Sequence, residues 1–205
     1  EERYFNLGWF GRHPWIYDLA DLGLKNLRRK AIKFLDLQAN QRVIDIATGT
    51  CSQGEEFAQL GHFVVGIDLD QKMLLKALPK TSQKLHILRA DGCFIPVPRG
   101  SFDAAVICFA LHDVPRPIGL RILGEAHRVI HDHGSIFIID HENPQYNLIS
   151  YLFSKLALLF ETPNFRAFHA IQLADYLHQA NLVVLRKSNL ALGAVSLTVA
   201  GKAVS

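Results

Sequence analysis

Short apolar runs alternate with amphipathic segments over the first two thirds of the chain. The apolar runs predict buried strands at residues 42–47, 63–67, 84–90, 102–109 and 135–140. Helical periodicity between them predicts helices near residues 55–60, 71–78 and 116–130. This alternation predicts a parallel sheet with right-handed crossovers. The runs AAVICFA and SIFIID are apolar throughout, which indicates strands covered on both faces.

The two ends of the chain have a different pattern. Residues 14–35 combine a helical apolar period with interspersed lysine and arginine, which predicts one or two amphipathic helices. A polar turn is expected at residues 131–134, before the fifth strand. The later segments are expected to be a helix at 145–160, a loop at 162–165, a helix at 170–179 and a hairpin of strands at 182–188 and 194–200.

Composition narrows the class of protein. The chain has 205 residues, of which 49% are apolar and 20% charged, so it can bury a single globular core. The formal net charge is only +3, and basic residues do not form a ladder with interleaved aromatics. Nucleic acid is therefore not the expected partner.

The three cysteines also limit the possibilities. Cys51, Cys93 and Cys108 are odd in number, lie far apart and lack the spacing of a zinc site or a disulfide scaffold. We therefore expect that the protein has no metal site and that it resides in a reducing cytoplasm. The first residues lack the basic start and apolar stretch of a signal peptide, and no apolar run reaches eighteen residues.

The strongest local signal is the run VIDIATGT at residues 43–50, followed by VVGID, which ends at Asp68. Gly49 allows backbone to approach a ligand closely. An acid that ends the next strand, 19 residues after Gly49, can accept hydrogen bonds from both ribose hydroxyls. The pair predicts an adenosine-containing ligand. The alternative is a tight strand-to-helix turn beside a solvated acid.

The glycine loop distinguishes between adenosine ligands. A pyrophosphate site needs G-x-G-x-x-G. Here Ala47 and Cys51, two residues before and after Gly49, stand at the positions where that pattern would have its neighbouring glycines. Asp45 would place a negative charge near the phosphates of a dinucleotide, whereas a zwitterionic amino-acid tail tolerates it. The loop favours S-adenosylmethionine over NAD.

Several motifs together resemble the class I S-adenosylmethionine-dependent methyltransferases. They are DIATGT, the strand-terminal Asp68, the step Ala90-Asp91-Gly92, and Ser101-Phe102-Asp103 before AAVICFALHDVP. The set is most similar to the type-11 branch, which includes ubiquinone and menaquinone C-methyltransferases, and it spans about residues 43–140. The family more often has glycine where Cys51 stands.

The resemblance implies an α/β, Rossmann-like, doubly wound seven-stranded sheet of order 3-2-1-4-5-7-6, mostly parallel, with the last strand antiparallel. It implies one methyltransferase domain over residues 1–205. Its parts would be an N-terminal helical cap (1–40), a cofactor-binding core (41–140), a lid or substrate insertion with a helix (141–181) and a C-terminal β-hairpin (182–205).

The resemblance also assigns the cofactor site. The residues expected at the methionine end of S-adenosylmethionine are Asp45, Ala47, Gly49 and Phe109. Asp68 would hold the ribose, and the residues expected around adenine are Leu69, Asp91 and Gly92, with Cys93 beside them.

Methyl transfer from a sulfonium mainly requires that the nucleophile and the methyl group be close and aligned. If the acceptor must lose a proton, the candidate bases are His112, Asp113, His141 and Glu142, which follow the fourth and fifth strands. Asp113 could instead cap the following helix, and the last two could be solvated loop residues. His169 is a weaker candidate. The cluster at 131–133 suggests a metal but is better explained as a polar turn at the opposite end of the sheet.

The stretch NLISYLFSKLALLF, residues 147–160, has only Lys155 as a charge. It must face the core, a second subunit or a lipophilic acceptor. A small, hydrophobic acceptor is therefore expected, with a soluble metabolite as the alternative. A homodimer and peripheral membrane contact through the basic N-terminal segment are further hypotheses.

Two rival functions stay open. A short-chain NAD-dependent oxidoreductase would use a Tyr-x-x-x-Lys pair, and Tyr151 and Lys155 have that spacing, but the apolar surroundings and the glycine loop oppose it. A non-catalytic homologue that keeps the cofactor pocket is the other rival.

Overall fold

The chain is described here from a computed structural model. The residues that it describes are 26, 28–32, 35, 37–142, 163–170, 172–190 and 193–203. Residues 28–32 are helical, in agreement with the expected N-terminal helix. The apolar helix expected at 145–160, with Tyr151 and Lys155, lies outside the described residues.

Seven strands form one sheet of order β3-β2-β1-β4-β5-β7-β6. The strands are β1 (Arg42–Ile46), β2 (Phe63–Asp68), β3 (Leu85–Arg89), β4 (Phe102–Cys108), β5 (Ile130–His141), β6 (Leu182–Leu190) and β7 (Val195–Lys202). The neighbours from β3 to β5 are parallel, whereas β7 runs antiparallel to both β5 and β6. The expected fold class, strand order and terminal hairpin are confirmed.

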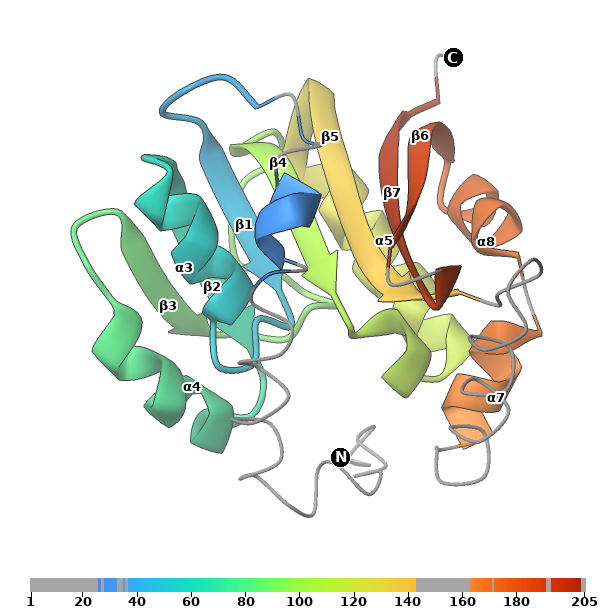
Figure 1. Cartoon of the computed structure of the whole chain (residues 1–205), viewed down its shortest axis with the longest axis horizontal. Helices are drawn as coiled ribbons and strands as arrows, with labels where there is room; N and C mark the ends of the chain where they lie inside the picture. The colour runs from blue at the N-terminus through green and yellow to red at the C-terminus, as the bar shows by residue number, and fades with distance from the viewer. Residues whose placement is uncertain are drawn as a thin grey trace.

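Helices cover the sheet on both faces (Figure 1). The described helices are α3 (Ser52–Gln59), α4 (Gln71–Ala77), α5 (Arg116–Val129), α7 (Pro163–His169) and α8 (Leu173–Gln179), with short 3-10 turns η1 (Leu78–Lys80) and η2 (Leu111–Asp113). In the view of Figure 1, the parallel strands point to the lower edge, where α7 also lies.

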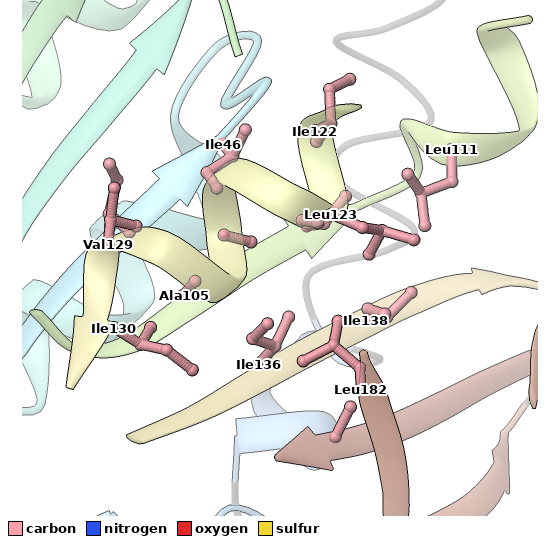
Figure 2. Close-up of a cluster of buried hydrophobic side chains, with 14 of the residues drawn as sticks. Ile46, Ala105, Leu111, Ile122, Leu123, Val129, Ile130, Ile136, Ile138 and Leu182 are labelled. Atoms are coloured by element: carbon pink, nitrogen blue, oxygen red, sulfur yellow. The ribbon is translucent and has the colours of Figure 1, made fainter. Parts of the chain in front are cut away.

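The core is two layers, one on each face of the sheet. Along β4, Ala105 and Ile107 belong to the layer packed on α5 and α8, whereas Ala104 and Val106 belong to the layer that contains Phe57 of α3. Figure 2 shows the first layer, with side chains of α5 pointing onto the strands. Because successive residues of a strand face opposite sides, a strand covered twice must be apolar at every position. This explains the unbroken runs in the sequence.

The polar turn expected at residues 131–134 is wrong. Strand β5 already begins at Ile130, which pairs with Phe102, and the register then shifts so that Ala104 pairs with Ser135. The residues between form an irregular stretch of the strand opposite Asp103. The polar composition misled the prediction, because an irregularity at the end of a strand tolerates the same residues as a turn.

The loop expected at 162–165 is also wrong within the described residues, because α7 begins at Pro163. Proline is favoured in the first turn of a helix, where its missing N–H costs no hydrogen bond. The expected helix at 170–179 is shorter, since α8 begins at Leu173. Among the described residues, no helix has the length and apolar character needed to cross a bilayer.

Candidate functional site

The predicted site residues lie at or just after the ends of the five strands β1 to β5. The neighbouring strands are parallel, so the loops that follow them meet along one edge of the sheet. Two backbone hydrogen bonds tie these loops to the strand ends: Thr48 N donates to Ile67 O at 2.9 Å, and Phe109 N donates to Ile139 O at 2.8 Å. The carboxyl ends of strands are the usual ligand-binding edge of an open α/β sheet.

The loop after β1 has an unusual backbone. Ala47, Gly49 and Cys51 all have positive φ, at 57°, 56° and 59°. A side chain at Gly49 would meet no atom within 4 Å, so the space beside this glycine is open to a ligand. Alternate left-handed residues turn the loop tightly from the strand into α3.

Cys51 fills a gap that two glycines leave. Its side chain is fully buried, and a Cβ atom at either Gly54 or Gly66 would lie only 2.8 Å from its Sγ. Burial raises the pKa of the Cys51 thiol to about 12. Cys51 therefore packs the loop against α3 and β2 as a neutral thiol.

Asp68 binds the glycine loop directly. Its Oδ2 accepts a hydrogen bond from Gly49 N at 2.7 Å, and its Oδ1 accepts one from Asp70 N at 2.8 Å. The side chain is only 8% exposed, and burial raises its pKa. Each carboxylate oxygen can accept more than one hydrogen bond, so both keep capacity for a diol.

Asp45 is buried beneath the same loop. Its Oδ2 accepts hydrogen bonds from Thr48 Oγ1 at 2.5 Å and from Gly54 N at 3.0 Å. Burial, partly offset by these two bonds, raises its pKa to about 6. A buried carboxylate at this position suits a ligand that carries a positive charge.

Replacing Asp45 by asparagine is expected to stabilise the folded chain at about pH 8 but not at about pH 4. The pKa of Asp45 rises from 3.8 to about 6 on folding, so ionisation in the folded state costs free energy. That cost is absent below the unfolded pKa, grows as the pH rises, and is complete above the folded pKa. Urea unfolding should show a gain of about 3 kcal/mol at the higher pH.

Asp175→Asn, on the exposed side of α8, is the control for the loss of one carboxylate. An equal gain for Asp45→Asn at both pH values would show that ionisation of Asp45 does not limit stability.

The loop after β3 lies next to Asp68. Ala90 N donates to Asp68 O at 3.1 Å, and Asp91 Oδ1 accepts a hydrogen bond from Cys93 N at 2.8 Å. A Cβ atom at Gly92 would lie 3.2 Å from Ile46 Cγ2, so this glycine packs closely on the end of β1. Two exposed apolar side chains, Leu69 and Phe94, follow β2 and β3. Apolar surface and the carboxylate of Asp91 thus lie near Asp68.

Three of the four candidate bases, His112, Asp113 and His141, form one cluster. His112 Nδ1 lies 2.6 Å from Asp140 Oδ1, and His112 Nε2 lies 3.5 Å from Asp113 Oδ2. His141 packs edge-on against His112, with ring centroids 4.6 Å apart. The alternative that Asp113 caps the next helix is wrong, because α5 follows Pro115 with no side-chain cap.

Aromatic rings enclose this cluster. Phe165 of α7 is buried and lies 5.4 Å from His112 and 4.9 Å from His141, centroid to centroid. Phe109, with a positive φ of 52°, lies 5.3 Å from His141. Asn164 Nδ2 also donates to Asp113 O at 2.9 Å, which joins α7 to η2. Helix α7 thereby covers the end of β4.

Other candidates lie elsewhere or are engaged. Glu142 forms an ion pair with Lys187 of β6 at 2.6 Å. His131 pairs with Asp103 at 3.1 Å at the opposite end of the sheet. His169 is the last residue of α7. Within the described ranges, no three His, Cys, Asp or Glu side chains form a group that could hold a metal ion.

A small hollow lies beside the histidine cluster, between η2, α5, α7 and α8. Its lining residues are Leu111, Val114, Arg116, Asn164, Ala167, Phe168 and Tyr176. The lining is largely apolar, and Tyr176 Oη within it donates to Arg116 O at 3.0 Å.

Asp140 was missed by the sequence reasoning. It ends the apolar run SIFIID in the same way that Asp68 ends VVGID. A carboxylate that closes a buried strand was the available signal, and it was used only for Asp68.

Comparisons with known proteins agree with this geometry. Residues 44–138 match the methyltransferase domain family. A demethylmenaquinone methyltransferase from Tropheryma whipplei is 30% identical over 166 residues, which cover 75% of this chain and 69% of that protein. A ubiquinone/menaquinone biosynthesis C-methyltransferase from Citrifermentans bemidjiense is 34% identical over 142 residues, 65% of this chain, and the match spans only 60% of that relative's length.

A solved structure has the same fold. The SAM dependent methyltransferase from Aquifex aeolicus superposes with a TM-score of 0.66 over 85% of this chain and 88% of that chain, at 20% identity.

Proposed function

Because the chain belongs to the class I S-adenosylmethionine-dependent methyltransferases, we propose that it transfers the methyl group of that cofactor to a small, hydrophobic acceptor. The observation that carries this proposal is the bond between Asp68 and Gly49 N. This bond joins the glycine loop to Asp68, whose carboxylate can accept hydrogen bonds from two neighbouring hydroxyl groups, at the ligand-binding edge of the sheet.

The residues present fit the cofactor. Open space lies beside Gly49, and both oxygens of Asp68 keep acceptor capacity for the ribose hydroxyls. The residues proposed at the methionine end are Asp45, Ala47, Gly49 and Phe109. Those proposed at the adenosine end are Asp68, Leu69, Asp91 and Gly92. The buried acid Asp45 suits the ammonium group of the zwitterionic amino-acid tail and opposes a pyrophosphate.

When bound, the cofactor supplies an electrophilic methyl group on a positively charged sulfur. The chain then has to hold the acceptor in line with that methyl group and exclude water. Phe165 and Phe109 provide apolar walls near the ends of β4 and β5. We propose His112 as the group that takes a proton from the acceptor, with His141 beside it. Glu142 is a weaker candidate, since it pairs with Lys187.

For the acceptor, we propose a quinone-type ring or another lipophilic small molecule. One of the two relatives is named for ubiquinone/menaquinone biosynthesis, and the other is named a demethylmenaquinone methyltransferase. A soluble metabolite is the alternative. We also propose a single domain in the cytoplasm, where the free thiols Cys51, Cys93 and Cys108 would stay reduced.

Calorimetry with S-adenosylhomocysteine and NAD, side by side, tests the cofactor part of this proposal. We expect binding of the homocysteine compound and none of NAD. A screen with tritiated methyl cofactor across quinol precursors, lipids and polar metabolites then tests the acceptor. Tight NAD binding without S-adenosylhomocysteine binding would exclude a methyltransferase, and label only in a protein or RNA fraction would exclude a small acceptor.

A further inference from the structure

Two carboxylates flank one imidazole at the end of β4. Asp140 lies 2.6 Å from His112 Nδ1, and Asp113 lies 3.5 Å from His112 Nε2. The two carboxylates differ in exposure: the Asp140 side chain is fully buried, whereas that of Asp113 is 40% exposed. The imidazole thus has an inner side toward β5 and an outer side toward the surface.

Asp140 is held in one orientation. Its Oδ2 accepts a hydrogen bond from Leu111 N at 3.1 Å, and its Oδ1 accepts another from His141 N at 2.8 Å. Burial alone would raise the pKa of Asp140, but its interactions with His112 and His141 hold it below its ordinary value. Asp140 is therefore an ionised acceptor with no freedom to turn away from His112.

We propose that Asp140 is a positioning residue that keeps a proton on His112 Nδ1, so that Nε2 is the base for an acceptor with a phenolic or enolic hydroxyl. This inference rests on the proposed function and adds the chemical class of the acceptor. A carboxylate on one ring nitrogen fixes the tautomer and stabilises the imidazolium when the other nitrogen takes a proton.

The reaction balances with one proton. The acceptor's O–H bond breaks, and its proton goes to His112 Nε2. The oxygen's electron pair, directly or through a conjugated ring carbon, forms the new bond to the methyl group. The carbon–sulfur bond breaks, and its electron pair stays on the sulfur, which becomes neutral. If a ring carbon is methylated, that carbon then loses its proton as the hydroxyl is re-formed.

Three titratable side chains face His112 from the described elements that pack against it. Asp140 and His141 come from β5, and Asp113 comes from η2, while α7 contributes the apolar Phe165. Burial raises the pKa of Asp113, although His112 opposes this. Asp113 and His112 Nε2 together can take one proton, which Asp113 can pass to or from the surface.

Nitrogen-15 NMR of the histidine side chains tests the tautomer without any turnover. Free histidine favours the proton on Nε2, so we expect His112 in the wild-type chain to show the opposite form, with Nδ1 protonated. Its signals are identified by their loss in His112→Gln. In Asp140→Asn the population should move toward the Nε2-protonated form. A wild-type His112 with Nε2 protonated would overturn the proposal.

Kinetics tests the consequence, with naphthohydroquinone as the probe acceptor. We expect Asp140→Asn to lower kcat about a hundredfold or more, with little change in KM. The loss should shrink at high pH, where the probe ionises without help. Asp103→Asn is the matched control, because Asp103 pairs with His131 at 3.1 Å at the far end of the sheet. It should change neither the rate nor the His112 signals.

A second variant, His112→Asn, tests the proposal even if Asp140→Asn does not fold. In His112→Asn the side-chain amide can still donate to Asp140, but no base is left. It should lose the same factor in kcat, and the double variant should lose no more than either single one, since Asp140 acts through His112. Additive losses would overturn the proposal. Failure of S-adenosylhomocysteine to bind would instead refute the proposed function.

Discussion

Gly119→Ala is expected to lower the free energy of unfolding by about 3 kcal/mol, because its new methyl group would overlap a buried ring. Gly119 lies in α5, where a Cβ atom would coincide with the Tyr176 hydroxyl of α8. Tyr176 is only 2% exposed and donates its hydroxyl hydrogen to Arg116 O, so it cannot move without losing both packing and a hydrogen bond. Urea unfolding of the purified chain measures the loss.

Gly124→Ala is the matched control on the same helix. A Cβ atom at Gly124 would meet no atom within 4 Å, so the substitution should stabilise by about 1 kcal/mol through helix propensity alone. Adding Tyr176→Phe to Gly119→Ala removes the overlapping oxygen and should restore part of the stability. The ring carbon Cζ, at 2.9 Å from the new Cβ, limits the recovery. If both glycine variants changed stability alike, the contact between α5 and α8 would be wrong.

Asp68→Ala is expected to weaken S-adenosylhomocysteine binding at least tenfold, or about 1.4 kcal/mol. The substitution removes the proposed acceptor of the ribose hydroxyls. It also frees Gly49 N, which now donates to Asp68 at 2.7 Å, so the glycine loop loses an anchor. Calorimetry on the variant measures the change, and thermal unfolding shows whether the fold persists.

Asp70→Ala separates this effect from a general loss of charge. Asp70 is two residues away, and its carboxylate accepts from Lys72 N at 2.8 Å at the start of α4. We expect its affinity for S-adenosylhomocysteine to stay close to that of the wild type. Unchanged affinity in Asp68→Ala would show that the ribose is held elsewhere.

The central strands could be predicted because burial on both faces of the sheet requires an apolar residue at nearly every position. The runs ending at Asp68 and Asp140 show this directly: β2 ends at Asp68, and β5 ends one residue after Asp140, at His141. Polar segments were harder. Residues 131–134 and Pro163 have compositions that suit turns, irregular strands and first turns of helices equally well, so only pairing and packing decide among them.

The two halves of the candidate site also differ in how far the sequence predicts them. Gly49 and Asp68 could be paired from the sequence because a strand–loop–helix–strand unit fixes their separation. His112 and Asp140 are 28 residues apart on neighbouring strand ends, and their contact depends on the register of β4 against β5. Phe165 contacts His112 from helix α7, which comes 53 residues later in the chain than His112. No local pattern encodes these contacts.

The left-handed turns at Ala47, Gly49 and Cys51 have a consequence for the thermodynamics of association. The loop already has its tight shape, secured by Asp45, Asp68 and the buried thiol. A ligand that docks against it therefore loses little affinity to ordering the backbone. The left-handed conformations of Ala47 and Cys51 cost free energy. This cost is part of the free energy of folding and is not incurred again when a ligand binds.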